Sequence, residues 1–230
     1  MKLVYESGYE YESKLGDRVI KFKAWTAKNE RDYLELLEKG PEDISDKLLF
    51  DTLIVPCIDD KKIVLSSAEQ KKLIIDIRKE SISDEIEDTR TCENCEEVTE
   101  IKFKIDSIME FVPAKFKDVT VKDIKFSFGP LTNNKQKENL KLEDGVIKYI
   151  FEDFMLHIKS IELNGEDISD FKKKELNDFI HSLPSKMFDE VFEAYQEQID
   201  KVNLDYEFTC PKCKHKEEID YTFIPNFLWA

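Results

Sequence analysis

Apolar and polar residues recur at helical spacing in the first part of the chain. The spacing predicts a helix over residues 27–39, with Thr26 as its N-cap. Ser45 is the expected cap of a second helix, which must stop before Pro56 because the residue before a proline is pushed out of the helical region. The run Ser66-Ser67-Ala68-Glu69 fits a capping box and predicts the start of a third, amphipathic helix.

Helical spacing returns after Gly145. Apolar residues over 150–161 predict a helix that ends at Asn164-Gly165. Two further helices are expected, one on each side of Pro184, and the second extends to Ile199.

Alternation with period two predicts strands elsewhere in the chain. The expected strands cover residues 101–105, 116–128, 204–208 and 219–224. Residues 1–25 alternate weakly and are expected to form an extended arm or an edge strand. The pattern therefore predicts an α+β fold, built from helices and short antiparallel strands.

Composition divides the chain into an N-terminal arm, residues 1–25, and two larger segments. Residues 26–132 form a helical segment with strands, and residues 145–230 form a second one. The polar stretch between them, residues 133–144, is expected to be mobile. The apolar tail, residues 225–230, is expected to be buried in the protein's own core or under a partner.

Four of the five cysteines form two Cys-x-x-Cys pairs, Cys92/Cys95 and Cys210/Cys213. A gap of two residues lets a tight turn point two thiolates at one ion, about 2.3 Å away. A threonine precedes each pair, and a charged stretch and a strand-like run follow it. The repeated pattern predicts two zinc-knuckle hairpins that form a ribbon-like element, one in each of the larger segments.

One structural Zn²⁺ is the interpretation that these pairs favour. Its ligands would be Cys92, Cys95, Cys210 and Cys213, which would join the middle of the chain to its end. Four thiolates leave no open position for water or substrate, so such an ion stabilises the fold and does not catalyse. His215 lies close after the second pair and is a fallback ligand.

Other uses of the cysteines stay open at this point. Each pair could hold an ion of its own, or the four residues could form two disulfides, which a reducing cytosol disfavours. A redox Cys-x-x-Cys pair normally opens a helix, whereas both pairs here lie between strand-like runs. Cys57 stands alone and is expected to be a small buried apolar residue.

The charge of the chain bears on its partners. The 230 residues include 35 basic and 50 acidic side chains, for a net charge of −15. Nucleic-acid binding draws on lysine and arginine, which here are interleaved with acids, so nucleic acid is an unlikely partner. The chain has no run of about 18 apolar residues, so the sequence predicts no membrane span. The N-terminus lacks the apolar stretch of a signal peptide, which predicts a cytoplasmic protein.

Signals of catalysis are missing from the sequence. His157 lies in an apolar run and is expected to be a packed residue, and His181 lies near a helix end, where the dipole favours it. The chain has no glycine-rich phosphate loop, no Gly-x-Ser-x-Gly elbow and no His-Glu-x-x-His helix. We therefore predict a protein that is not an enzyme.

Several of these motifs together resemble the small baseplate hub subunits and hub assembly proteins of T-even-like contractile-tailed bacteriophages. The residues that carry the resemblance are the helix Ser66 to Arg78, Cys92-x-x-Cys95 with the strand after it, the run His157 to Ile161, the helix ending Ser182-Leu183-Pro184, and Cys210-Pro211-Lys212-Cys213 with the Phe-rich end from Phe223 to Trp229. The likeness covers about residues 20–230. Glu96 and Lys214 stand where glycine more usually follows such a cysteine pair.

The resemblance implies a structural component or an assembly chaperone of the tail baseplate hub, with no enzymatic activity. It implies other baseplate or tail hub proteins as partners, and a location in the host cytoplasm during assembly and in the virion tail. Two alternatives remain from the residues. One is a zinc-ribbon module that binds nucleic acid or acts in transcription. The other is a metal-dependent enzyme that uses His157 or His215, which would need an open position on the metal.

Overall fold

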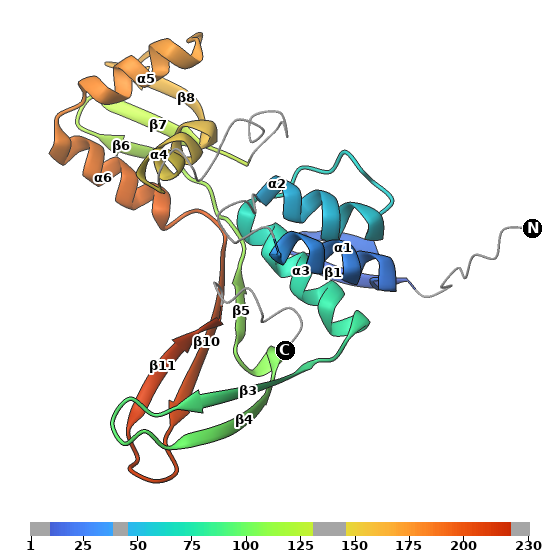
Figure 1. The fold of residues 1–230 in the computed structure, drawn as a ribbon. Helices are drawn as coiled ribbons and strands as arrows, with labels where there is room; N and C mark the ends of the chain where they lie inside the picture. The colour runs from blue at the N-terminus through green and yellow to red at the C-terminus, as the bar shows by residue number, and fades with distance from the viewer. Residues whose placement is uncertain (1–9, 39–45, 131–145, 222–230) are drawn as a thin grey trace, which may run out of the picture. The chain divides into compact units, whose positions relative to one another are not determined.

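The computed structural model describes residues 10–38, 46–130 and 146–221, which form two compact units (Figure 1). Unit 1 combines the described residues up to Lys61 with Ser67–Val112 and those from Lys201 onward. Unit 2 combines Lys62–Ser66 with Pro113–Asp200. Both contain helices and antiparallel strands, which confirms the predicted α+β class. The arm and the two segments drawn along the chain stay a prediction.

Unit 1 begins with an antiparallel strand pair, β1 (Tyr11–Leu15) and β2 (Arg18–Phe22). Two residues connect the strands, and the first of them, Gly16, has a φ of +62°. Glycine enters this region without the steric cost of a Cβ atom, which is why tight hairpin connections favour it. The first described residues therefore fold back on themselves, where the sequence suggested an arm or a single edge strand.

Helix α1 (Ala27–Leu37) begins after Thr26, as predicted. The Thr26 backbone N–H donates a hydrogen bond to Asn29 Oδ1 at 2.9 Å, which fixes the start of the helix. Leu36 and Tyr33 on its inner face are buried. Leu34, which the apolar spacing also placed on this face, is exposed instead.

The second predicted helix is less regular than expected. Helix α2 (Asp46–Leu49) continues into a π-helical turn, η2 (Phe50–Ile54), and then a 3₁₀ turn, η3 (Val55–Cys57). Pro56 lies inside the 3₁₀ turn, so regular α-helical bonding ends before it while the chain keeps turning. The proposed cap, Ser45, lies outside the described residues.

Helix α3 (Ser67–Ser81) buries one apolar face and also Arg78, whose side chain is fully enclosed. The Arg78 guanidinium donates hydrogen bonds to the backbone carbonyls of Ser83 and Glu85. Burial lowers the pKa of Arg78, and these carbonyls replace part of the water that the guanidinium loses. The contact fixes the start of strand β3 (Glu85–Thr91) against the helix.

Two long antiparallel strand pairs follow in unit 1. Strand β3 pairs with β4 (Val98–Lys104), and β10 (Lys201–Thr209) pairs with β11 (Lys216–Asp220). The first half of β10 pairs with β5 (Met109–Val112), which a 3₁₀ turn, η4 (Ile105–Ser107), connects to β4. Strands from the middle of the chain and from near its end thus share one sheet.

The facing sides of the two strand pairs form a common core. Ile86, Ile101 and Phe208 are buried in it, and the rings of Phe103 and Tyr206 stack with centroids 4.5 Å apart. Cys92 and Cys210 belong to the same buried cluster. Apolar packing therefore brings the two cysteine-bearing ends of the pairs together.

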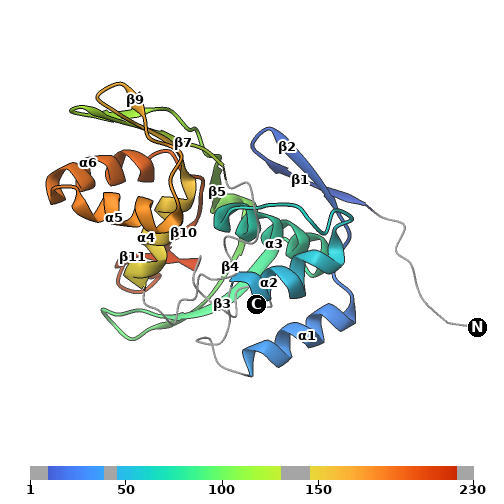
Figure 2. The same ribbon diagram turned by 90° about the horizontal axis from the view of Figure 1, so that it is seen from above.

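Unit 2 is a sheet covered by helices on one face (Figures 1 and 2). Its antiparallel strands are β6 (Val119–Val121), β7 (Ile124–Phe128), β8 (Ile158–Leu163) and β9 (Glu166–Asp167). Its helices are α4 (Val146–His157), α5 (Lys173–Ser182) and α6 (Ser185–Gln196). The core between the two layers is rich in aromatic rings, with Phe126, Phe154 and Tyr195 fully buried.

One predicted helix was wrong in its second half. The helical spacing over 150–161 suggested a single element, but α4 ends at His157 and β8 follows at once. Ile161 in β8 pairs with Phe126 in β7, and β-branched isoleucines suit such a half-buried sheet. Short apolar runs satisfy either period, so tertiary pairing decides between them. Strand β11 likewise begins at Lys216, before the predicted start.

Two other expectations cannot be compared with the fold. The polar stretch 133–144 and the apolar tail 225–230 lie outside the described residues.

Replacing Phe154 by alanine should lower the free energy of unfolding of the protein by about 3–5 kcal/mol. The ring is fully buried and contacts the rings of Phe128, Phe188 and Tyr195. Urea unfolding followed by far-UV circular dichroism measures the loss. Ile150→Ala is the control, because Ile150 lies on the same helix but is 40% exposed, and should cost about 1 kcal/mol or less. Equal losses for the two variants would contradict the packing described here.

Candidate metal centre

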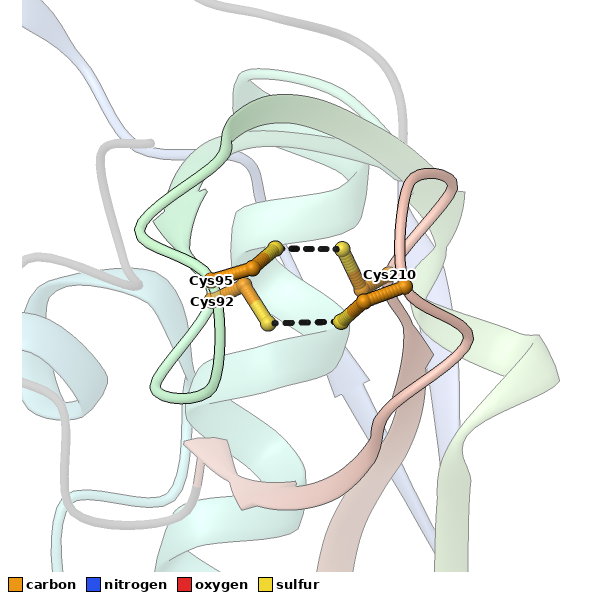
Figure 3. Close-up of side chains that lie close together, drawn as sticks. Cys92, Cys95 and Cys210 are labelled. Atoms are coloured by element: carbon orange, nitrogen blue, oxygen red, sulfur yellow. Dashed lines mark hydrogen bonds between the residues drawn. The ribbon is translucent and has the colours of Figure 1, made fainter.

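The four paired cysteines lie in two loops of unit 1. Cys92 and Cys95 lie in the loop between β3 and β4, and Cys210 and Cys213 lie in the loop between β10 and β11. Figure 3 shows the side chains of Cys92, Cys95 and Cys210 pointing into the space between the loops. The structure therefore brings all four predicted site residues together.

The two loops have the same backbone hydrogen bonds. In the first, the Cys92 N–H donates to the Glu97 carbonyl at 2.9 Å, and the Glu96 N–H donates to the Cys92 carbonyl at 2.9 Å. The second loop repeats both bonds: the Cys210 N–H donates to the His215 carbonyl at 2.9 Å, and the Lys214 N–H donates to the Cys210 carbonyl at 3.0 Å. The similarity of the two stretches in sequence thus extends to their conformation.

Glu96 and Lys214, at matching positions in the two loops, have φ angles of +58° and +63°. This left-handed region costs a residue with a Cβ atom about 1–2 kcal/mol. These are the positions where glycine is more usual, so the chain adopts the same turn without the residue that fits it best. The surrounding loop hydrogen bonds and the packed core must offset that strain.

The sulfur atoms are spaced as metal ligands are. Cys92 Sγ lies 3.6 Å from Cys213 Sγ, and Cys95 Sγ lies 3.6 Å from Cys210 Sγ. All four sulfurs lie within 4.8 Å of one another. A tetrahedral ion with zinc–sulfur bonds of about 2.3 Å separates its ligands by about 3.8 Å. The four sulfurs could therefore hold a metal ion with small adjustments.

Two cysteines of the group are buried and two are not. Cys92 and Cys210 are 1% and 0% exposed, whereas Cys95 and Cys213 are half-buried. All five cysteines carry free sulfurs. Both pairs lie between strands and not at a helix start, so the feature that activates a redox pair is lacking.

Hydrogen bonds from neighbouring residues favour the ionised form of one cysteine of the group, Cys213. The Asn94 side chain and the backbone N–H of His215 donate to Cys213 and lower the pKa of its thiol to about 6. Asn94 is one of the two residues between the cysteines of the first loop, so a side chain of one loop stabilises a charge on the other. Sequence reasoning missed this role, because an asparagine inside a Cys-x-x-Cys pair carries no signal by itself.

Cys95 and Cys92 resist ionisation. The backbone N–H of Glu97 lowers the pKa of Cys95, but burial and the three neighbouring sulfurs outweigh it and raise the pKa to about 12. Burial also raises the pKa of Cys92. A metal ion at this site must therefore displace protons, so its apparent affinity falls as the pH falls.

The remaining candidate residues lie outside the four-sulfur group. Cys57 is 4% exposed, as expected of a small buried residue, and burial raises its pKa to about 12. His215, the fallback ligand, lies with Glu93 and Glu217 instead. His157 is packed in unit 2, where its Nδ1 lies 2.9 Å from the Gly129 carbonyl, and His181 lies in the last turn of α5.

A comparison of the sequence with models of protein families shows which family the chain belongs to. The sequence model of a family described as T4 bacteriophage base plate protein matches residues 7–229, nearly the whole length. The chain belongs to this family. Membership of the T4 base plate family confirms the phage baseplate resemblance found in the sequence. Neither a search of curated proteins nor a search of solved structures finds a match.

Within the described part of this T4 base plate family member, no helix has both the length and the apolar character needed to cross a membrane.

In the metal-free, reduced protein at pH 7, Cys213 should be the first cysteine that iodoacetamide modifies. Its pKa of about 6 makes it largely thiolate at this pH, and it is half-buried, whereas Cys57 and Cys95 stay protonated. Mass spectrometry of tryptic peptides after limited alkylation gives the order. Asn94→Ala is the control, since loss of its hydrogen bond should raise the pKa of Cys213 and slow its reaction. Modification of Cys95 ahead of Cys213 would contradict the electrostatics described here.

Proposed function

We propose that the chain is a non-enzymatic structural component or assembly chaperone of a phage tail baseplate hub, stapled by one structural Zn²⁺. The family match over residues 7–229 is the observation that carries the baseplate role. A role in the hub goes beyond the family and rests on the sequence resemblance. The protein would act in the host cytoplasm during assembly, and as a subunit it would remain in the virion tail.

The proposed zinc ligands are Cys92, Cys95, Cys210 and Cys213. Their spacing and the free state of their sulfurs support zinc, a common ion in closed four-thiolate sites. The cysteines that face each other are 115 and 121 positions apart in sequence. A cross-link over a loop of about 100 residues removes roughly 4.7 kcal/mol of chain entropy from the unfolded state. Zinc would thus add to the stability that the packed core of unit 1 provides.

A rigid unit suits the proposed role because baseplate proteins must hold their neighbours in place. In a staple of this kind, the ends of two strand pairs are joined at one ion and cannot separate without losing it. The partners that we propose are other baseplate or tail hub proteins. The open choice is between a subunit that stays in the particle and a chaperone that leaves it.

The nucleic-acid alternative has less support. On the exposed face of β10 and β11, Asp205 lies directly opposite Asp220, and Glu207 lies opposite Glu218. Such a face repels a phosphate backbone, and the net charge of −15 does the same at longer range. A zinc ribbon that reads DNA or RNA would need basic side chains in this position.

The metal-enzyme alternative also has less support. A catalytic zinc keeps a position open for water, whereas four thiolates close the site. His157 is 4% exposed and its Nδ1 is engaged by the Gly129 carbonyl, which accounts for it as a packed residue of unit 2.

Purified protein should contain zinc, and Cys92→Ser or Cys210→Ser should abolish its retention. The free energy of unfolding should then fall by about 5 kcal/mol, which lowers the melting temperature by on the order of 10 °C. Elemental analysis and calorimetry measure the two effects. Cys57→Ala is the matched control, because it removes a buried thiol of the same unit and should leave the zinc content unchanged. Unchanged metal content and melting in Cys92→Ser would refute the staple.

Co-expression of the tagged chain with the hub proteins of the same phage should recover at least one of them in a pull-down. A tail-fibre protein of that phage serves as the negative control. Recovery of no hub protein would count against the hub role. Mass spectrometry of purified particles then separates the two forms of the proposal: a subunit is present in mature tails, and a chaperone is absent from them.

A further inference from the structure

A second group of side chains that could bind a metal lies in the same two loops. The donor atoms of Glu93, His215 and Glu217 lie within 4.8 Å of one another. Glu93 lies inside the first cysteine pair, whereas His215 and Glu217 follow the second pair at the start of β11. The group therefore spans the same two loops but shares no ligand with the four cysteines.

The carboxylate of Glu217 is already held between the loops. Its Oε1 accepts a hydrogen bond from the Glu93 backbone N–H at 3.0 Å and lies 3.8 Å from His215 Nε2. The Glu217 side chain is only 17% exposed, and that of His215 is 40% exposed. One ligand is thus fixed in place, and a second lies beside it at the surface.

The other donor atoms of the group are available. Within the described residues, no hydrogen bond engages the imidazole nitrogens of His215 or the side-chain carboxylate of Glu93. Two nearby lysines are used elsewhere, since Lys212 pairs with Glu97 and Lys216 pairs with Glu207. A third, Lys214, makes no ion pair with the group within the described residues. Within the described residues, two carboxylates therefore gather beside an imidazole without an ion pair to a lysine or arginine.

We propose that Glu93, His215 and Glu217 bind a second divalent cation of the zinc type. One imidazole and two carboxylates form a ligand set that Zn²⁺ and its neighbours in the transition series accept. Bonds of about 2.1 Å place tetrahedral ligands about 3.4 Å apart, so the imidazole must approach Glu217 by a few tenths of an ångström. Glu93 is exposed, and its side chain can rotate to complete the set.

This second ion differs in kind from the proposed four-thiolate zinc. Three protein ligands at the surface leave a coordination position to solvent, so the ion should bind more weakly and exchange faster. It would join the two loops from outside and would neutralise the carboxylates of Glu93 and Glu217.

The test is a zinc titration of the full-length protein by isothermal calorimetry, with metal counted by mass spectrometry. The wild type should bind two ions per chain, one tightly and one more weakly. Glu217→Gln and His215→Ala should weaken the second ion at least tenfold, since loss of even a supporting group around a metal site costs about 10–100-fold. Glutamine can still accept the Glu93 N–H hydrogen bond, so the loop contact survives in the first variant.

Glu96→Gln is the matched control, because it removes one negative charge from the same loop without touching the group. It should bind the second ion as the wild type does. Co²⁺ provides the second readout: sulfur-to-cobalt charge-transfer bands should be unchanged in Glu217→Gln and His215→Ala, because these variants keep all four cysteines.

Two results would overturn the inference. One is a single ion per wild-type chain that gives the charge-transfer bands and does not depend on Glu217, and the other is a second ion that all variants bind equally well. The proposed four-thiolate zinc fails by a different result, namely the absence of the charge-transfer bands. A weak ion that depends on Glu217 but binds without those bands would support this site and refute the zinc staple.

Discussion

The meeting of four sulfur atoms between two loops is the feature of unit 1 on which the proposed staple depends. Cys95 and Cys210 are 115 positions apart in sequence, yet their sulfurs lie 3.6 Å apart. Packing brings the loops to this distance, because Phe103, Tyr206 and Phe208 fill the space between the strand pairs behind them. An ion at the sulfurs would turn this approach into a bond between the middle of the chain and its end.

Two local features of unit 1 raise its energy. Glu96 and Lys214 adopt left-handed backbone conformations. Each such conformation costs about 1–2 kcal/mol. The buried guanidinium of Arg78, by contrast, is satisfied by backbone carbonyls and fixes β3 against α3. A metal ion at the four sulfurs would offset this strain within the same two loops. Such a cross-link also suits a protein of the T4 base plate family, which associates with other baseplate proteins.

The sequence predicted the features that local rules control. The cap at Thr26 gave α1, and alternation gave β4 and β10, because capping and periodicity are properties of a few neighbouring residues. Spacing also identified the four cysteines that the fold brings together. The change from α4 to β8 at Ile158 was missed, since it depends on pairing with β7. Asn94 and the group around His215 were missed for the same reason: their neighbours come from the other loop.

X-ray absorption at the zinc edge tests the central claim most directly. On purified protein that carries one zinc per chain, the account predicts four sulfur neighbours at about 2.3 Å. A first shell dominated by nitrogen or oxygen, or protein that retains no zinc at all, would contradict it.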